Sequence, residues 1–454
     1  MRASRYELDM CQGSIFKNTI RFAIPLMLTT FLSLFYHAAD IIVVSRWTGS
    51  EAMASVGATT ALINLITNFF VGFSIGVSII VSRKYGARDN DGLHRVIHTS
   101  MLFACFLGVL ALVTGVIFSR PLLKIMGTPE GKVLDGAVRY MRIIFLGKPA
   151  VLLYSFGSAI LRAVGDTKRS LYISSISGLL NVVLNLILVI VFKMGVAGVA
   201  IATIVSQYVS LVIQTCILIR ADGVYKLCLN KLKIYKKELV ETIKIGLPTG
   251  LQNVVFNFAN TIIQSAVNSF GAAAMAGNAA GANIESFAYG IKNAFYQATV
   301  TGVSQNYGAK NEKRMKKCVS VSLMCMIVGG LALGVIMAVF ARPLLSIYIT
   351  DSPEAMNCGV IRVIITALPY FLSGIMEIYT GYLRGLGYAT TSTVNSFIGV
   401  CGLRILWILA IFPLNRTLGM LYLCWPLSWL TVIILHNISL IFLKKKAIER
   451  MYSA

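Results

Sequence analysis

Acidic residues are scarce in this sequence of 454 residues. Only 18 Asp and Glu stand against 41 Lys and Arg, and charged residues make up 13% of the chain. A soluble domain carries about twice that share of charged residues. Hydrophobic residues make up 57% of the sequence. This composition excludes an ordinary water-soluble domain and predicts an integral membrane protein.

Motifs of nucleotide and metal chemistry are also missing from the sequence. No G-x-x-x-x-G-K-[ST] phosphate loop occurs, so ATP is not expected as the energy source. The nine cysteines are scattered and form no C-x-x-C pair. His94 and His98 are spaced i, i+4, but they lie at a polar helix start without a further ligand at metal spacing. We therefore expect no enzyme, no resident cofactor and no metal site, except for a coupling ion.

Long apolar runs recur from one end of the chain to the other. Crossing about 30 Å of hydrocarbon takes roughly 20 helical residues, and continuous runs of this length are not typical of transmembrane strands, which alternate over about 10 residues. The sequence therefore predicts an all-α membrane protein of twelve helices. The runs are residues 15–45, 52–81, 96–118, 138–157, 171–192, 196–219, 240–269, 272–302, 319–340, 360–382, 390–412 and 418–443.

The Lys and Arg residues are sorted by side of the membrane. The N-terminus, every second loop and the C-terminal end hold 28 of the 41. The positive-inside rule places these segments, and so both termini, in the cytoplasm. A net charge of +23 is also compatible with nucleic-acid binding. We discard it, because basic loops beside a membrane need no partner other than anionic lipid.

The sequence repeats itself at an offset of about 222 residues. Residues 85–88 (YGAR) recur at 307–310 (YGAK), residues 120–123 (RPLL) recur at 342–345, and Pro25 matches Pro248 after one gap. Six helices per copy make the two copies parallel, which is typical of transporters with two lobes. We predict an N-terminal lobe at 1–219, a cytoplasmic linker at 220–244 and a C-terminal lobe at 245–454.

Three acidic residues fall inside predicted helices and away from their first residues: Asp40, Glu285 and Glu377. An ionised carboxylate in the membrane costs several kcal/mol unless it is paired or faces water, so each is a functional candidate. Asp40 is predicted to bind an ion or a proton, with a structural partnership to an Arg or a buried amide as the alternative. Tyr36 and His37 precede it by about one turn, which allows a small polar cluster, and they are candidates for substrate binding or gating together with Pro25.

Asparagines lie one turn apart on the fifth predicted helix. Asn181 and Asn185 share one face of an otherwise aliphatic segment. Their amide oxygens suit coordination of a small cation or a bond to a neutral carboxyl group. Such residues also serve as glue between membrane helices, and the sequence leaves the two interpretations open.

Two acidic residues of the C-terminal half each have a basic residue on the same helix face. Glu377 precedes Arg384 by two turns, which suits either a gate or proton relay, or a structural salt bridge. Glu285 lies seven residues before Lys292, and we expect these two to form a self-compensating pair. Substrate or gating roles for Glu285 and Glu377 remain open at this stage.

Four groups of residues match one known family. They are the duplicated YGA(R/K), the duplicated Arg-x-x-Gly at 162–165 and 384–387, Ile24-Pro25 with Asp40, and GVAGVAIAT at 195–203. Through them nearly the whole chain resembles the multidrug and toxic compound extrusion (MATE) family. The resemblance implies twelve helices in two lobes, and export of bulky, often cationic and aromatic compounds in exchange for protons or sodium ions.

The DinF-like branch of that family is the nearer match, since the seventh predicted helix lacks the acidic residue typical of NorM-like members. That branch places its cation site in the N-terminal lobe, and Asp40, Asn181, Asn185 and Thr203 occupy the matching positions. Many members have Asp where this chain has Asn185. A proline proposed to let the first helix bend when the aspartate changes state is matched by Pro25.

We therefore expect a secondary active multidrug antiporter of the bacterial cytoplasmic membrane, which exports organic cations in exchange for H⁺ or Na⁺. A lipid-linked oligosaccharide flippase is the first alternative, because related two-lobe transporters do that work. A channel or a non-transporting scaffold is the second. The expected partners are small cationic amphipathic molecules and membrane lipid, and the expected oligomeric state is a monomer.

Overall fold

The computed structural model describes residues 6–47, 50–221, 223–350 and 352–453, with backbone alone for 44–46 and 50–54. Residues 1–5 and 454, at the outer ends of the two predicted lobes, lie outside this description. All regular structure in the described ranges is helical. The all-α prediction is confirmed.

The helices of the first half follow one another with short connections. They are α1 (Ile15–Trp47), α2 (Ser50–Gly86), α3 (Asn90–Ile125), α4 (Lys132–Leu146), α5 (Lys148–Ala163), α6 (Lys168–Asn185), the π-helix η1 (Leu186–Val191) and α7 (Gly195–Ile219).

The second half begins with the short helix η2 (Leu229–Lys231). It continues with α8 (Lys236–Asn268), α9 (Ala272–Gly308), α10 (Glu312–Val339), α11 (Ala341–Leu345), α12 (Pro353–Ala367), α13 (Tyr370–Gly385), α14 (Ala389–Ser396), η3 (Phe397–Gly402), α15 (Leu403–Leu406), η4 (Trp407–Ile411), η5 (Phe412–Leu414), α16 (Leu418–Tyr422) and α17 (Cys424–Ser453).

Among the described residues, up to ten of the twelve predicted membrane spans are supported by helices of sufficient length and apolar character. Eight continuous helical stretches are long and apolar enough to cross a membrane, and α4 with α5 and α12 with α13 form two further spans, each bent by 44°. Pro149 and Pro369 lie at these two bends, where a missing backbone donor permits a kink. α8 and α9 are 33 and 37 residues long but more polar; they are not among these candidate spans, and they coincide in position with the predicted runs 240–269 and 272–302.

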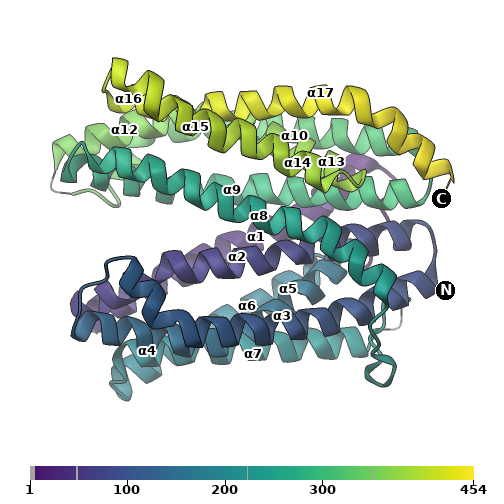
Figure 1. Cartoon of the computed structure of the whole chain (residues 1–454), viewed down its shortest axis with the longest axis horizontal. Coiled ribbons are helices and arrows are strands. Elements are labelled where there is room, and N and C mark those ends of the chain that lie inside the picture. Colours follow the sequence, from purple (N-terminus) through teal and green to yellow (C-terminus); the bar gives the residue numbers. More distant parts are fainter. Residues whose placement is uncertain (1–5, 48–49, 222, 351, 454) are drawn as a thin grey trace. The chain divides into compact units, whose positions relative to one another are not determined.

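The chain forms two compact units, each a bundle of long helices (Figure 1). One unit contains residues 28–85 and 89–250 with the first eight residues of the chain, and the other contains residues 9–27, 86–88 and 251–454. The start of α1 therefore groups with the second half of the chain, and the start of α8 groups with the first. The predicted division into an N-terminal lobe at 1–219, a linker at 220–244 and a C-terminal lobe at 245–454 stays a prediction.

Close approach of helix backbones explains why the start of α8 joins the first unit. A Cβ atom on Gly72 of α2 would lie 2.4 Å from the Cα atom of Gly250 in α8. One turn further along α2, a Cβ on Gly76 would lie 3.0 Å from the amide nitrogen of Gly246. Small residues at this spacing let membrane helices pack with little between their backbones. A larger residue at Gly72 would push the two helices apart.

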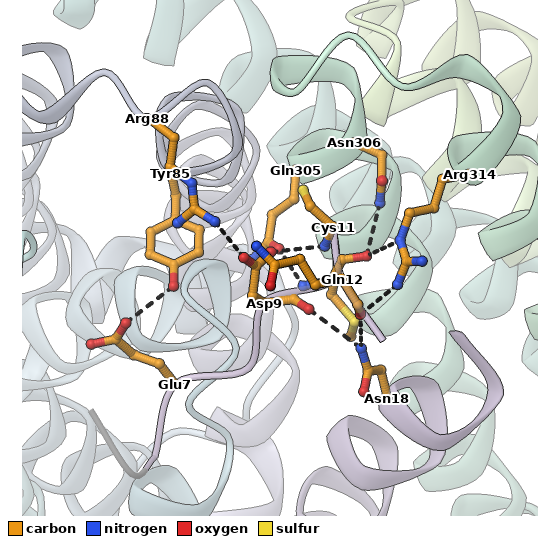
Figure 2. Close-up of polar contacts among 11 residues, drawn as sticks. Glu7, Asp9, Cys11, Gln12, Asn18, Tyr85, Arg88, Gln305, Asn306 and Arg314 are labelled. Atoms are coloured by element: carbon orange, nitrogen blue, oxygen red, sulfur yellow. Dashed lines mark hydrogen bonds and ion pairs between the residues drawn. The ribbon is translucent and has the colours of Figure 1, made fainter. Parts of the chain in front are cut away.

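Side chains of the second unit hold the segment that precedes α1. Gln305 accepts a hydrogen bond from the Met10 amide at 2.8 Å, and the Met10 carbonyl accepts from Arg314 Nε at 2.8 Å and from Asn306 Nδ2 at 3.2 Å (Figure 2). Asn18 Nδ2, in the first turn of α1, donates to the Gln12 carbonyl at 2.8 Å. The start of α1 is thus fixed by hydrogen bonds that satisfy backbone groups outside any helix.

The chain changes unit between Leu8 and Asp9, and the side chains on either side of this point explain it. Tyr85 donates a hydrogen bond to Glu7 at 3.1 Å, and both residues belong to the first unit (Figure 2). Arg88 forms an ion pair with Asp9, and both belong to the second. Each unit therefore has its own polar contacts to this short segment.

A buried carboxylate in the loop between α5 and α6 provides a pH-dependent prediction. Asp166 is fully buried; its Oδ1 accepts a 3.1 Å bond from the Arg169 amide, and burial raises its pKa from 3.8 to about 6. The folded protein therefore binds this proton more tightly than the unfolded chain does. The stability contributed by the protonated group is complete below about pH 4 and is lost as pH rises through 6, by at most about 3 kcal/mol.

We expect Asp166→Asn to flatten this part of the pH dependence, because the amide keeps an acceptor for Arg169 and does not ionise. The measurement is the apparent melting temperature of the purified protein in detergent between pH 4 and 7. An equal decline of both proteins over this range would mean that Asp166 is not its source.

Candidate ion-binding site

Three helices of the first unit bring four of the predicted site residues together. Asp40 lies on α1, Asn181 and Asn185 lie on the last turns of α6, and Thr203 lies on α7. Asn185 Nδ2 donates to Asp40 Oδ1 and to Asn181 Oδ1, the latter at 3.4 Å. Asn181 Nδ2 lies 3.5 Å from Thr203 Oγ1. The i, i+4 spacing read from the sequence is what aligns the two amides.

Acceptor oxygens outnumber donors in this cluster. Asn185 is fully buried, and its amide oxygen has no hydrogen-bond partner among the described residues. Thr203 donates its own hydroxyl proton to the Val199 carbonyl at 2.9 Å, so it has none to offer to the cluster. An unpaired buried acceptor is costly. A proton on Asp40 or a small cation would be favourable beside these oxygens.

The helix changes its winding directly after the cluster. Asn185 is the last residue of α6, and the π-helix η1 begins at Leu186. π-helical turns are frequent at functional sites because they leave backbone groups and side chains in unusual positions. This feature has no signal in the sequence.

Tyr36 and His37 do not form the polar cluster with Asp40 that the sequence suggested. The Tyr36 hydroxyl donates to the Ser175 carbonyl at 3.3 Å, and a Cβ on Gly178 would meet the Tyr36 ring at 1.8 Å. Tyr36 therefore packs α1 against α6. His37 is exposed, and among the described residues its side chain has no hydrogen bond. Pro25 lies inside α1, which continues through it.

Two further groups of the first unit were not singled out from the sequence. Tyr140 on α4 lies close enough to Asp40 for the phenol to feel its charge. Lys148, at the bend between α4 and α5, is 4% exposed and lies 5.6 Å from the Phe145 ring centre. No described carboxylate pairs with it. Neither residue belongs to a recognisable motif.

Glu285 does not pair with Lys292, and that expectation is wrong. Glu285 Oε2 lies 2.9 Å from Arg362 Nη2 of α12, and Glu285 also accepts a bond from Thr366. Arg362 binds the amide oxygen of Asn278 as well. Heptad spacing puts Glu285 and Lys292 on one face of α9, but different neighbouring side chains meet that face at the two levels.

Glu377 pairs with Lys292 rather than with Arg384. Lys292 Nζ lies 3.8 Å from Glu377 Oε1 and 3.2 Å from Ser373 Oγ. Arg384 instead donates to Tyr296 and to Gln252, the latter at 2.9 Å. A salt bridge of Glu377 with Arg384 is therefore not formed in this structure.

Arg404 on α15 is buried in the second unit, as Arg362 and Arg384 are. Its Nη1 donates to Asn260 Oδ1 at 2.9 Å and its Nε to Ser428 Oγ at 3.3 Å, and no carboxylate among the described residues pairs with it. The guanidinium groups of Arg362 and Arg404 both approach the Trp425 ring, at 4.8 and 5.9 Å from its centre. The interior of the second unit is thus richer in positive than in negative side chains.

Comparison with known proteins agrees with this architecture. The MatE family model matches residues 25–187 and 248–408, one range in each copy of the repeat. The probable multidrug resistance protein YoeA of Bacillus subtilis (strain 168) is 27% identical over 448 residues, which cover 96% of each chain. The multidrug export protein MepA of Staphylococcus saprophyticus is 24% identical over 418 residues, which cover 92% of this chain and 91% of that protein.

Solved structures share the fold over the whole length. An outward-facing multidrug resistance MATE family transporter of the MOP superfamily superposes with a TM-score of 0.90 at 20% identity, and all of both chains is covered. The family model accounts for more than half of the residues. The chain belongs to the MatE family of multidrug efflux transporters, and it is a multi-pass membrane transporter rather than an enzyme.

Proposed function

We propose that the protein exports organic cations in exchange for H⁺ or Na⁺, and that Asp40, Asn181, Asn185 and Thr203 bind the coupling ion. The observation that carries this proposal is the buried, unpartnered amide oxygen of Asn185 beside the Asp40 carboxylate. A cluster with spare acceptors in the first unit favours a proton or a small cation. Relatives named for multidrug resistance and multidrug export support the efflux function.

Neutralisation of Asp40 would be the coupling step. An ion that binds from the outer side removes the negative charge that an organic cation needs, so ion and substrate exclude each other. Pro25 weakens the same helix by removing one backbone hydrogen bond, which makes α1 able to bend when Asp40 repacks.

The energy of the exchange is sufficient for export. A one-for-one exchange of a monovalent ion for a monovalent organic cation moves no net charge, so a tenfold ion gradient supplies about 1.4 kcal/mol. A second ion per cycle adds as much again, and the net charge that it carries across 100 mV contributes about 2.3 kcal/mol.

Dye transport in liposomes tests the proposal directly. The purified protein is reconstituted with a fluorescent organic cation, and a sodium gradient and a proton gradient are imposed separately. We expect dye movement under at least one gradient, which also identifies the ion. Dye movement that ignores both gradients would instead indicate a channel, and no movement under either would contradict cation antiport.

Asn185→Asp should strengthen cation binding. The substitution adds a second carboxylate to the cluster at nearly constant volume, and many family members that the sequence resembles carry Asp there. We expect the coupling ion to bind about tenfold more tightly, which corresponds to about 1.4 kcal/mol. The measurement is the ion concentration that gives half-maximal dye exchange. Unchanged ion dependence in Asn185→Asp would argue against an ion site at this position.

The flippase alternative receives no support from the relatives, which are named for multidrug resistance and export. We further propose that the protein acts as a monomer in the bacterial cytoplasmic membrane with both termini in the cytoplasm. The distribution of Lys and Arg supports this orientation. A DinF-like relationship is likewise a proposal, supported by the four matching residues of the first unit.

A further inference from the structure

A cysteine of the linker meets two histidines of α3 in the first unit. His94 and His98 lie near the start of α3, and Cys228 lies in the loop between α7 and η2. One ligand atom from each residue lies within 4.8 Å of the other two. The sequence did not predict this cluster, because Cys228 is 130 residues away from His98. Two imidazoles and a thiol are the donor set that Zn²⁺ and related ions prefer.

The ring of His98 is already oriented as a metal ligand would be. Its Nδ1 lies 2.7 Å from the His94 carbonyl oxygen, which can only accept, so Nδ1 carries a proton. In the neutral ring Nε2 therefore carries the lone pair, and it accepts a hydrogen bond from the Cys228 amide at 3.1 Å, which a bound ion would replace. A backbone carbonyl that fixes the other ring nitrogen is the usual support of a histidine that binds a metal.

The other two residues have no competing partner. The His94 ring stacks on His98 with 3.8 Å between ring centres, and among the described residues it makes no hydrogen bond. Cys228 is a free thiol. Both are partly exposed, whereas His98 is fully buried, so an ion can reach the cluster from solvent.

The thiol of Cys228 can offset part of the charge of a bound ion. A thiolate formed at Cys228 on metal binding would release its proton to solvent and leave a site of one negative and two neutral ligands.

We propose that His94, His98 and Cys228 form a binding site for a transition-metal ion of the Zn²⁺ type, with a fourth position for water. The linker already contacts α3 through Thr99, which accepts from the Tyr235 amide at 3.0 Å and donates to the Lys233 carbonyl at 3.4 Å. A bound ion adds a much stronger link between Cys228 and α3. The site therefore fastens residues 228–235 to α3 when metal is present.

Metal binding is measured on the full-length protein in detergent, after removal of metal, by titration with Zn²⁺ against a chromophoric chelator. We expect one tight site per chain. Loss of an outer-shell partner alone costs about 10–100-fold in affinity, so Cys228→Ser and His94→Asn should each cost at least that much. Replacing Zn²⁺ with Co²⁺ should give a thiolate charge-transfer absorption that Cys228→Ser abolishes.

Cys216→Ser is the matched control, because Cys216 is an exposed thiol on α7 of the same unit. It should bind Zn²⁺ as the wild type does. Zn²⁺ should also slow proteolysis after Lys231 and Lys233 in the wild type and not in Cys228→Ser. The variants avoid His98, whose hydrogen bonds hold the linker in the absence of metal. A wild type without a one-per-chain site, or Zn²⁺ binding that survives Cys228→Ser, would overturn the proposal; neither readout depends on transport.

Discussion

Asp40→Asn is expected to reduce gradient-driven dye export to the level of protein-free liposomes. The amide cannot ionise, so the site no longer alternates between a charged and a neutral state. For one ion exchanged against a monovalent cation under a tenfold gradient, the driving force lost is about 1.4 kcal/mol, which corresponds to a tenfold loss of accumulation, and a second ion per cycle raises the loss to about 5 kcal/mol at 100 mV. The assay is dye flux in liposomes with each gradient imposed separately.

The variant should still fold, which separates loss of coupling from loss of structure. Asn at position 40 keeps the shape of the side chain and an oxygen that accepts from Asn185 Nδ2. Asp135→Asn is the matched control, since Asp135 lies on α4 of the same unit and its side chain is 65% exposed. It should export as the wild type does. Coupled export at the normal rate in Asp40→Asn would remove Asp40 from the mechanism.

Glu285→Ala is expected to destabilise the second unit by about 3–5 kcal/mol. The substitution removes the carboxylate that lies 2.9 Å from Arg362 and leaves a guanidinium that is 5% exposed without its counter-charge. Breaking one side of a buried ion pair costs this much because the remaining charge stays desolvated. The measurement is the apparent melting temperature in detergent, together with the fraction that remains monodisperse.

Removing both charges provides the test of that explanation. A double substitution, Glu285→Met with Arg362→Met, keeps much of the volume and leaves no isolated charge, so it should recover most of the lost stability. Glu354→Ala is a further control, because Glu354 lies in the first turn of α12 and is exposed. If the double variant is no more stable than Glu285→Ala, the loss comes from packing and not from the unpaired Arg362.

The sequence was informative about the fold because membrane-spanning helices can be recognised by the length of their apolar runs. Residues 240–269 and 272–302 were assigned as spans despite the many amides of α8, and the helices found there are long. The repeat offset likewise predicted equivalent prolines, and both ranges matched by the family model begin at them. The bends between α4 and α5 and between α12 and α13 were not predicted, because a proline in an apolar run does not by itself reveal whether the helix is kinked.

Side chains on different helices were harder to pair. Asn181 and Asn185 were placed on one face correctly, because helical periodicity determines that relation within one helix. Glu285 was assigned to the wrong cation because its partner Arg362 lies 77 residues away, and which face of α12 meets α9 depends on packing that no local pattern encodes. Cys228 was missed beside His98 for the same reason.

The first residues of α1 and of α8 each belong to the unit formed mainly by the other half of the chain. This arrangement bears on how the protein would tolerate a break in the linker. α1 passes from one unit to the other after Met27, and α8 does so after Gly250, 223 positions later, the same interval that separates Pro25 from Pro248. The beginning of the first helix of each repeat copy thus packs in the unit that is formed mainly by the other copy. A cut in the linker would leave each fragment without the helix start that belongs to its unit, so we expect neither fragment to form a complete bundle alone.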